Sequence, residues 1–278
     1  MKLLSAAAGA VLLFQNLIYP NLHDASSSGL QVQCEKLGLV DLEFSGAGGS
    51  ARVYKGTGSR RKDNGVLDTY AVKISRVAAK QSVEKESRIL EVLEQNGVTN
   101  VEKFITSKCS FPSKSKLAIL NAMDMKDDLG IQIYTAIYQP YLNPPEASSI
   151  SQLETIPLQV QTTRDLIKSV IDILSCNVYI TDLQFLVEKS SGIFLIIDLT
   201  EGGFLGESGA ITDRDLYLVR SFLGEAISFV QESIACAKDP STRLLLKEAA
   251  VEGVKQSLIT RHLEPEVNQI VMQMMEEI

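Results

Sequence analysis

The chain has 278 residues, of which 45% are hydrophobic and 22% are charged. This composition is that of an ordinary globular protein, and the length suits one or two domains. The formal net charge is −7. It excludes a protein that binds nucleic acid over its whole surface, because such a surface needs an excess of Lys and Arg.

The N-terminus has the layout of a secretory signal peptide. Lys2 precedes an apolar run over residues 3–14, and a small polar stretch follows at 25–29. A basic start, an apolar segment and small residues are typical of such leaders. We therefore predict a leader over residues 1–28 and a location in the secretory pathway or in an organelle reached through it. A signal anchor would be the chain's one contact with a membrane. The alternative is an N-terminal helix packed on the domain of a cytoplasmic protein.

Residues 39–75 read as strands interrupted by a glycine-rich loop. Alternating apolar and polar residues predict a strand over 39–44. Residues 46–51 follow as Gly-Ala-Gly-Gly-Ser-Ala, and residues 52–56 resume a strand. Asn64-Gly65 predicts a hairpin turn, since both residues tolerate positive φ. The next strand, over 66–74, carries Lys73, whose ammonium needs an anion if the strand is apolar.

A helix is predicted over residues 81–94, because apolar residues recur on one side of it. Strand candidates follow near 101–110 and 130–138. The segment 140–145 contains three prolines and breaks the pattern. We expect the boundary between two lobes there, with one lobe over 39–142 and the other over 143–278.

The second lobe is predicted to be mainly helical. Apolar residues recur at helical spacing over 162–176. The run 178–180 leads into Asp182, and the two apolar segments 185–188 and 193–197 form a short hairpin that ends at Asp198. From Asp213 to Ile278 the chain reads as helix, with breaks near 238–240 and 262–265.

Histidine and cysteine limit the possible chemistry. Two histidines and four cysteines are present, so a His-rich zinc site cannot be built. The cysteines are widely spaced, which argues against a zinc signature and against a dense disulfide framework. Cys176 and Cys236 lie in apolar helical patterns, and we expect both to be buried thiols.

Several of these segments stand in the order found in protein kinases. They are Gly46-x-Gly48-x-x-Ala51-x-Val53, Ala71-Val72-Lys73, Glu86 with Ile89-Leu90 after it, Asp182-Leu183 and Asp198-Leu199-Thr200. The chain resembles the eukaryotic protein kinase-like superfamily from about Leu39 onward. The resemblance implies an α+β, bilobal protein kinase-like fold, with a small β-rich N-lobe that has one helix and a reduced, mainly helical C-lobe.

The resemblance also implies an ATP site. Glycines let backbone N–H groups approach phosphate oxygens. Lys73 would pair the α- and β-phosphates and be held by Glu86, with Glu84 as the fallback partner. A dinucleotide-binding loop is the alternative, but it needs a helix directly after the glycines. The implied nucleotide-binding residues are Gly46, Ala47, Gly48, Gly49, Ser50, Val53, Ala71 and Lys73.

The two aspartates fall on the reacting end of the nucleotide. The resemblance implies that Asp182 is the catalytic residue that orients the attacking hydroxyl and that Asp198 is a ligand of Mg²⁺. The segment around Asp182 departs from the family, since Ile180 and Thr181 replace His and Arg. Val187 stands at the position of the Asn that holds a second metal ion, and an apolar side chain cannot ligate Mg²⁺.

These observations favour an ATP-dependent phosphotransferase that acts on a hydroxyl acceptor of the Ser/Thr type. Val187 favours the alternative of a pseudokinase that serves as a binding or scaffold module. The short segment between Asp198 and Asp213 leaves no room for a long peptide platform. It therefore favours a third alternative, a small-molecule phosphotransferase. A helical interaction protein with coincidental motifs is the last alternative. The acceptor, protein or small molecule, is not identified by the sequence.

Overall fold

The computed structural model describes residues 29–47, 51–61, 67–76, 80–122, 133–142, 146–207 and 209–278. They form two compact units, and the predicted α+β class is confirmed. One unit comprises the chain up to Lys80 together with Ile105–Tyr141, and the other comprises Gln81–Phe104 and Leu142–Ile278. The division after Tyr141 lies one residue from the expected lobe boundary, while the segment 81–104 groups with the second unit.

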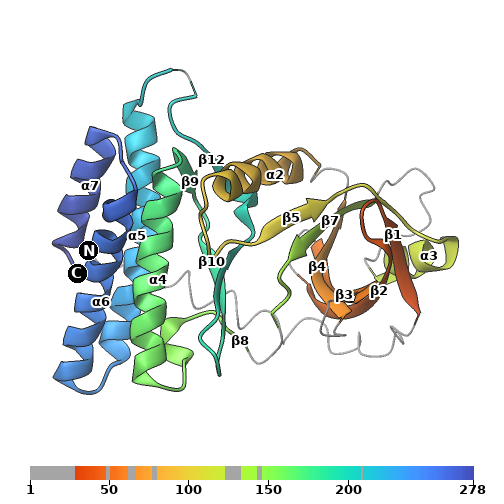
Figure 1. Cartoon of the computed structure of the whole chain (residues 1–278), viewed down its shortest axis with the longest axis horizontal. Coiled ribbons are helices and arrows are strands. Elements are labelled where there is room, and N and C mark those ends of the chain that lie inside the picture. Colours follow the sequence, from red (N-terminus) through yellow and green to blue (C-terminus); the bar gives the residue numbers. More distant parts are fainter. Residues whose placement is uncertain are drawn as a thin grey trace. The chain divides into compact units, whose positions relative to one another are not determined.

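A curled sheet dominates the first unit (Figure 1). Hydrogen bonding follows the order β5-β7-β4-β3-β2-β1-β6, and the pairs from β6 through β1, β2, β3 and β4 to β7 are antiparallel. The strands are β1 (Leu30–Cys34), β2 (Gly38–Ala47), β3 (Ala51–Arg61), β4 (Leu67–Arg76), β5 (Lys103–Thr106), β6 (Cys109–Ser110) and β7 (Ile133–Gln139).

The core of the first unit lies on one face of this sheet. Along β2 the buried Val40 and Leu42 alternate with the exposed Asp41 and Glu43, as the period of a strand requires. Strands β1, β3, β4 and β7 contribute to the same face. The buried residues of this core are Val32, Cys34, Val40, Leu42, Tyr54, Tyr70, Val72, Ile74, Ile119 and Ile137.

Two elements of the range up to residue 142 were not predicted. Strand β1 precedes residue 39, and α3 (Ser113–Ala122) is a second helix, so the expectation of one helix in this range is wrong. Helix α3 packs on β1, where Ser115 Oγ accepts a hydrogen bond from the backbone N–H of Gln31 at 3.0 Å. Ile119 of α3 is fully buried in the core. Because its apolar residues do not gather on one face, α3 has no clear helical signature in the sequence.

The cysteines also differ from expectation. Cys34 of β1 and Cys109 of β6 form a disulfide across neighbouring strands. Cys176 is half-buried and Cys236 is exposed, so the prediction of two buried thiols is wrong. Cys236 is the last residue of its helix, and residues 235 and 236 are both exposed.

The second unit contains a layer of helices (Figure 1). Those predicted over 81–94, 162–176 and the C-terminal region are confirmed, with the breaks at the expected places. A capping box between Thr212 and Asp215 begins one of them, and Asp239 caps the next. The helices are α2 (Lys80–Gln95), α4 (Ile156–Leu174), α5 (Asp213–Cys236), α6 (Pro240–Thr260) and α7 (Pro265–Met275).

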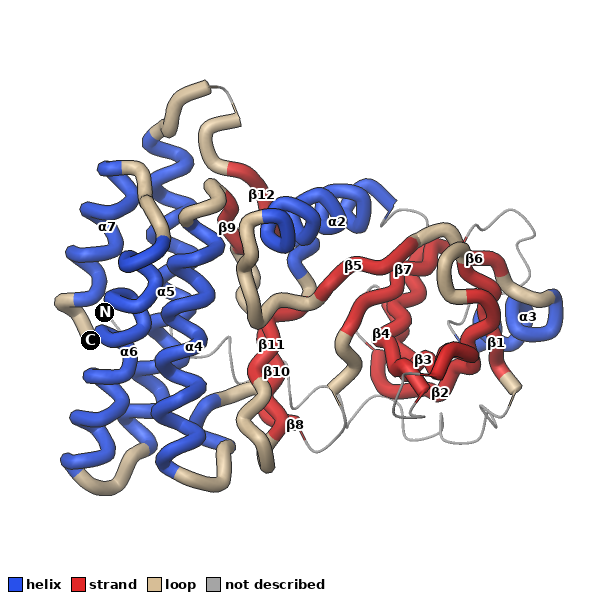
Figure 2. The backbone as a smooth tube through the Cα atoms, viewed as in Figure 1, coloured by secondary structure: helices blue, strands red, loops and turns tan. Residues whose placement is uncertain are grey.

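Two small sheets complete the second unit (Figure 2). One has the order β11-β10-β8, and the other is the pair β12-β9. The predicted hairpin of two apolar segments is confirmed as β10 and β11. The strands are β8 (Glu146–Ala147), β9 (Val178–Ile180), β10 (Gln184–Glu188), β11 (Phe194–Ile197) and β12 (Gly202–Phe204), with 3-10 turns at Ile150–Gln152 and Leu199–Glu201.

A buried carboxylate fastens the helices of the second unit. Asp172 of α4 is 2% exposed and accepts a hydrogen bond from Ser257 of α6. Lys168 forms an ion pair with it, and Arg261 lies 3.7 Å away. The guanidinium of Arg261 also donates to the backbone oxygen of Asn96, just after α2, at 2.6 Å. This network joins α4, α6 and the end of α2.

Three of the sequence predictions fall on residues outside the described ranges: the leader over 1–28, the centre of the glycine loop at 48–50 and the turn at Asn64-Gly65. Among the helices that the structure describes, none has the length and apolarity that crossing a bilayer requires.

Candidate functional site

The glycine loop joins two long antiparallel strands. Gly46 pairs with Val53 and Ala47 pairs with Arg52, and a bulge lies between Phe44 and Gly46. The predicted residues Gly48, Gly49 and Ser50 are outside the described ranges. Because strand β3 begins at Ala51 and no helix follows, the dinucleotide-binding alternative is excluded. A methyl group at Gly46 would meet no atom within 4 Å, so packing does not require a glycine at this position.

Three predicted nucleotide-binding residues share one face of the first unit's sheet. Lys73 on β4 pairs directly with Val53 on β3, and Ala71 lies two residues before Lys73. All three are half-buried. Their neighbours Val72 and Ile74 point to the opposite face and belong to the core. The sheet therefore separates a closed apolar face from a face that carries the lysine.

Lys55 adds a second cation to the face of Lys73, since it pairs with Ala71 across the strands. Its ammonium lies 5.8 Å from the centre of the Tyr141 ring, within the range of a cation–π contact. The Tyr141 hydroxyl is 3.0 Å from Ser45 Oγ, just before the glycine loop. This face is therefore polar and positively charged next to the loop.

The two predicted aspartates lie in adjoining turns of the second unit. Strand β9 pairs with β12, with Ile180 opposite Gly202. Strand β10 pairs with β11, with Gln184 opposite Ile197. The chain passes from β9 to β10 through residues 181–183 and from β11 to β12 through residues 198–201, so these two turns must lie side by side (Figure 2). We call these two turns the aspartate junction.

A hydrogen bond across the aspartate junction supports this placement. Thr181 Oγ1 donates to the backbone oxygen of Glu201 at 2.9 Å. Asp182 and Asp198 are therefore brought together by strand pairing, although they lie 16 positions apart in the chain. The junction contains a third carboxylate, that of the exposed Glu201.

Asp198 has an unusual backbone. Its φ of 56° and ψ of 63° lie in the left-handed region. Residues other than glycine seldom adopt this conformation, although Asp does so more often than most, and such residues cluster at functional sites. Thr200 Oγ1 donates to Asp198 Oδ1 at 2.7 Å. The backbone N–H of Asp198 donates to Glu102 Oε1 at 2.6 Å. These contacts fix both the main chain and the carboxylate.

Asp182 is exposed, and its carboxylate is oriented by a neighbour. Gln184 Nε2 donates to Asp182 Oδ2 at 2.7 Å. The next residue, Leu183, donates its backbone N–H to Glu225 Oε2 of α5 at 2.7 Å. Burial raises the pKa of the Glu225 carboxyl, the Leu183 N–H lowers it, and the charge of Asp182 raises it. The junction is thus a region of concentrated negative charge.

Glu86 lies on the buried face of α2 and is fully buried itself. Ile89, one turn later, approaches β12 so closely that a methyl group on Gly202 would lie 3.0 Å from its Cδ1. Glu84 is exposed, so the fallback partner does not lie on the packed face. The pairing of Glu86 with Lys73, which belongs to the first unit, stays a prediction.

Val187 does not stand at a metal-binding position. It lies inside the three-stranded sheet, between Ala147 of β8 and Phe194 of β11, and is fully buried. The resemblance places three residues between Leu183 and Val187 in the family's catalytic loop, but here they belong to strand β10, which begins at Gln184. The loop is short, so the amide that reaches the junction is that of Gln184.

The donor set of the junction fits Mg²⁺. Among the described residues, no group of three or more His, Cys, Asp and Glu side chains is placed to hold a metal ion. Mg²⁺ usually takes only one or two carboxylates, with phosphates and water completing its shell. Asp198 and Asp182 supply carboxylate oxygens, and Gln184 supplies an amide group, all of which are hard oxygen donors.

Sequence reasoning assigned no role to Glu102, Thr200 or Glu225, which contact Asp198 or the turn that carries Asp182. Thr200 lies two positions from Asp198, so proximity in the sequence was a usable signal. Glu102 and Glu225 carry no such signal, because they reach the junction from other elements.

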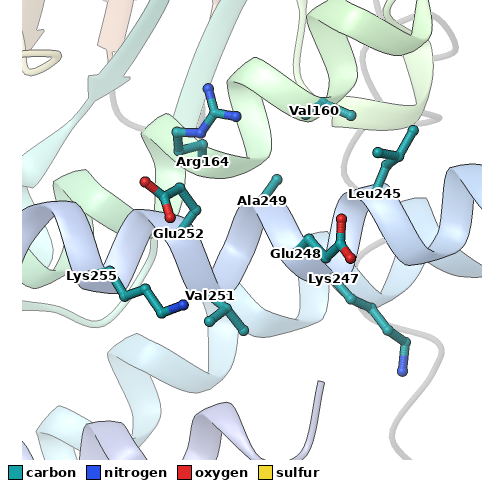
Figure 3. A pocket seen from close by; sticks show the side chains of 9 residues that line it. All are labelled: Val160, Arg164, Leu245, Lys247, Glu248, Ala249, Val251, Glu252 and Lys255. Carbon is teal, nitrogen blue, oxygen red and sulfur yellow. The ribbon is translucent and has the colours of Figure 1, made fainter.

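A pocket between α4 and α6 is separate from these residues (Figure 3). Cations and carboxylates are mixed along it, and none of its residues belongs to the predicted set. They are Val160, Arg164, Leu245, Lys247, Glu248, Ala249, Val251, Glu252 and Lys255.

No protein-family model matches the chain, and no curated protein is significantly similar to it in sequence.

Proposed function

We propose that the chain is an ATP-binding, protein kinase-like phosphotransferase with a bilobal fold, which transfers the γ-phosphate to a hydroxyl acceptor. The observation that carries the proposal is the aspartate junction, where two separate hairpin-like pairings bring Asp182 and Asp198 into adjoining turns. The lysine-bearing face of the first unit, next to a glycine loop, supplies the complementary cationic half.

The first unit would bind the phosphates. Backbone N–H groups of the glycine loop approach phosphate oxygens where no Cβ intervenes, and Gly46 has open space beside it. The ammonium of Lys73 pairs with the α- and β-phosphates. Glu86, which α2 carries on its packed face, is the carboxylate proposed to hold that ammonium in place.

The second unit would bind the metal ion and the acceptor. Bound Mg²⁺ neutralises charge on the phosphates. Asp198 holds it, and Gln184 is the neutral oxygen donor in place of residue 187. The acceptor hydroxyl donates a hydrogen bond to the Asp182 carboxylate. Its oxygen forms a bond to the γ-phosphorus as the bond from that phosphorus to the β–γ bridging oxygen breaks, and its proton passes to Asp182.

Calorimetric titration with Mg·ATP tests the nucleotide site. We expect binding by the wild type and a loss of about ten-fold or more in affinity for Lys73→Met, which keeps the aliphatic stem and removes one phosphate pairing. Lys103→Met is the matched control, because Lys103 is an exposed lysine paired with Glu94. Equal affinity of the wild type and Lys73→Met would contradict the nucleotide proposal.

Turnover of the γ-phosphate separates the candidate activities. We expect Asp182→Asn to lower turnover by about 100-fold or more while Mg·ATP affinity is kept, since a general base contributes on that scale. Asp213→Asn, at an exposed position, is the control. Phosphorylation of sugars or amino alcohols but not of peptides would select the small-molecule phosphotransferase. Persistent turnover in Asp182→Asn would contradict the role of Asp182.

A pseudokinase is the second candidate. The hydrogen bond from Gln184 to Asp182 favours it, because it engages the carboxylate that would orient the acceptor. Stable Mg·ATP binding by the wild type without turnover on any acceptor, its own side chains included, would select this function.

We also propose that the chain resides in the secretory pathway or an organelle reached through it. The disulfide between Cys34 and Cys109 supports this location, since such bonds persist in oxidising compartments. Thiol labelling of the cellular protein tests it. We expect two of the four cysteines to react only after reduction, and full labelling without reduction would contradict the proposal.

A further inference from the structure

Glu102 is a buried carboxylate in contact with the backbone of Asp198. It is 6% exposed, and a charged side chain is seldom buried without a specific role because it loses its hydration. Its Oε1 accepts the N–H of Asp198 at 2.6 Å, across a separation of 96 positions. A hydrogen bond to an ionised acceptor is short and about twice as strong as one between neutral groups.

The backbone around Glu102 fixes the place of this carboxylate. The Glu102 N–H donates to the oxygen of Ile196 at 3.0 Å, and the Ile196 N–H donates to the oxygen of Asn100 at 2.8 Å. Val101 and Ile196 form a parallel bridge. The segment before β5 is therefore bound along β11 by its main chain, and it delivers the Glu102 side chain to the end of that strand whether or not the side chain makes its bond.

Asp198 needs such a contact because of its conformation. A residue with a side chain in the left-handed region is strained, and Asp198 has a φ of 56°. Thr200 Oγ1 orients the carboxylate but does not bind the backbone N–H. The acceptor bound to that N–H is the Glu102 carboxylate, so Glu102 stabilises the turn in the conformation that directs the Asp198 side chain.

We propose that Glu102 is a positioning residue for the metal-binding function of Asp198. It holds Asp198 in its left-handed conformation and thereby presents the carboxylate for Mg²⁺ bound with the nucleotide. This role rests on the proposed function. The hydrogen bond from the Asp198 N–H to Glu102 does not depend on that function, because the protein forms it without ligands.

The first readout uses the protein without nucleotide or metal. Hydrogen exchange of the Asp198 amide is measured by NMR in the wild type and in Glu102→Gln, which keeps an acceptor oxygen, and in Glu102→Ala, which does not. We expect exchange to be about ten-fold faster in Glu102→Ala and intermediate in Glu102→Gln, as the strength of a charge-assisted bond implies. Asp213→Asn is the control, since it removes an exposed carboxylate that lies outside the junction.

The second readout is the Mg²⁺ concentration that gives half-maximal ATP binding. We expect it to rise about ten-fold in Glu102→Ala, to rise less in Glu102→Gln and to stay unchanged in Asp213→Asn. Affinity for ATP without metal should be equal in all four proteins, because a positioning role for Asp198 acts through Mg²⁺. A variant with general structural damage would lose metal-free affinity as well.

The outcomes distinguish the two proposals. If the wild type binds Mg·ATP and Glu102→Gln and Glu102→Ala keep its Mg²⁺ dependence, the role of Glu102 is wrong and the proposed function stands. If the wild type does not bind Mg·ATP, the proposed function fails and the role of Glu102 in it fails too. Equal exchange of the Asp198 amide in all variants would also overturn the inference. Should Glu102→Ala fail to fold, Glu102→Gln decides both readouts.

Discussion

The sheet of the first unit and the aspartate junction of the second differ in how closely their residues follow local conformational preferences. The sheet closes an apolar face through simple alternation, and a disulfide joins its neighbouring strands β1 and β6. The junction instead contains a left-handed aspartate, whose backbone N–H is bound by the buried carboxylate of Glu102. Departures from local preference are expected at functional or strained sites, and the proposed function places the metal-binding aspartate at one of them.

The largest effect is expected from removing the disulfide of the sheet. Replacing Cys34 and Cys109 together by Ser should lower the free energy of unfolding of the first unit by about 2–5 kcal/mol, because the bond joins residues 75 positions apart. Hydrogen exchange measured by mass spectrometry in urea should show loss of protection in β1 and β2, while β9 and β12 keep theirs. Cys176→Ser is the control. Equal loss of protection in β1 and β2 and in β9 and β12 would show that the two units do not unfold independently.

Two glycines of the first unit should respond differently to the same substitution. A methyl group at Gly56 would lie 2.7 Å from Val72 Cγ2 and 2.9 Å from Val40 Cγ1, so Gly56→Ala should destabilise the sheet by about 1–3 kcal/mol through overpacking. Gly46→Ala has open space and should leave stability within about 0.5 kcal/mol. Its effect should appear in Mg·ATP affinity instead. Thermal unfolding and calorimetry measure the two effects, and a destabilised Gly46→Ala would contradict the distinction.

Val187→Asn tests whether residue 187 belongs to the buried sheet or to the metal-binding junction. A polar amide at this fully buried position should lower the free energy of unfolding by about 1–3 kcal/mol, without any gain of Mg²⁺ binding. Leu186→Asn, at the half-buried neighbouring position on the other face, should cost less. Urea unfolding and Mg²⁺ titration check these expectations. A gain of Mg²⁺ affinity in Val187→Asn would restore residue 187 as a metal ligand.

The smallest effect concerns the pH dependence of the junction. Because burial raises the pKa of Glu225 in the folded state, the unfolded chain releases this proton first as pH rises. Glu225 is neutral in both states well below its ordinary pKa of 4.5. Stability is then lost as pH rises from that value to the raised one. Glu225→Gln should lack this loss. Thermal unfolding midpoints of the wild type and Glu225→Gln, measured from about pH 4 to about pH 7, test this expectation. If the two midpoints change with pH in parallel, the raised pKa of Glu225 is contradicted.

Part of the fold and site was predictable because its signals are local. Alternation in β2, helical spacing in α4 and the caps of α5 and α6 are written within a few residues of each element. Asp182 and Asp198 each follow an apolar strand, which marks them as turn residues at strand ends. Helix α3 escaped prediction because its apolar residues do not gather on one face, whereas β1 was missed although its five residues alternate between apolar and polar.

The sequence by itself determined the α+β class, the helices α2 and α4 to α7, the hairpin of β10 and β11, and the choice of the two aspartates as candidate site residues. The tertiary structure decided that Val187 is core, that Gln184 reaches the junction, that Cys34 meets Cys109 and that Glu102 binds the backbone of Asp198. The physical reason is that periodicity and capping act over a few residues. Strand pairing and burial instead join positions as far apart as Glu102 and Asp198, whose contact no local pattern records.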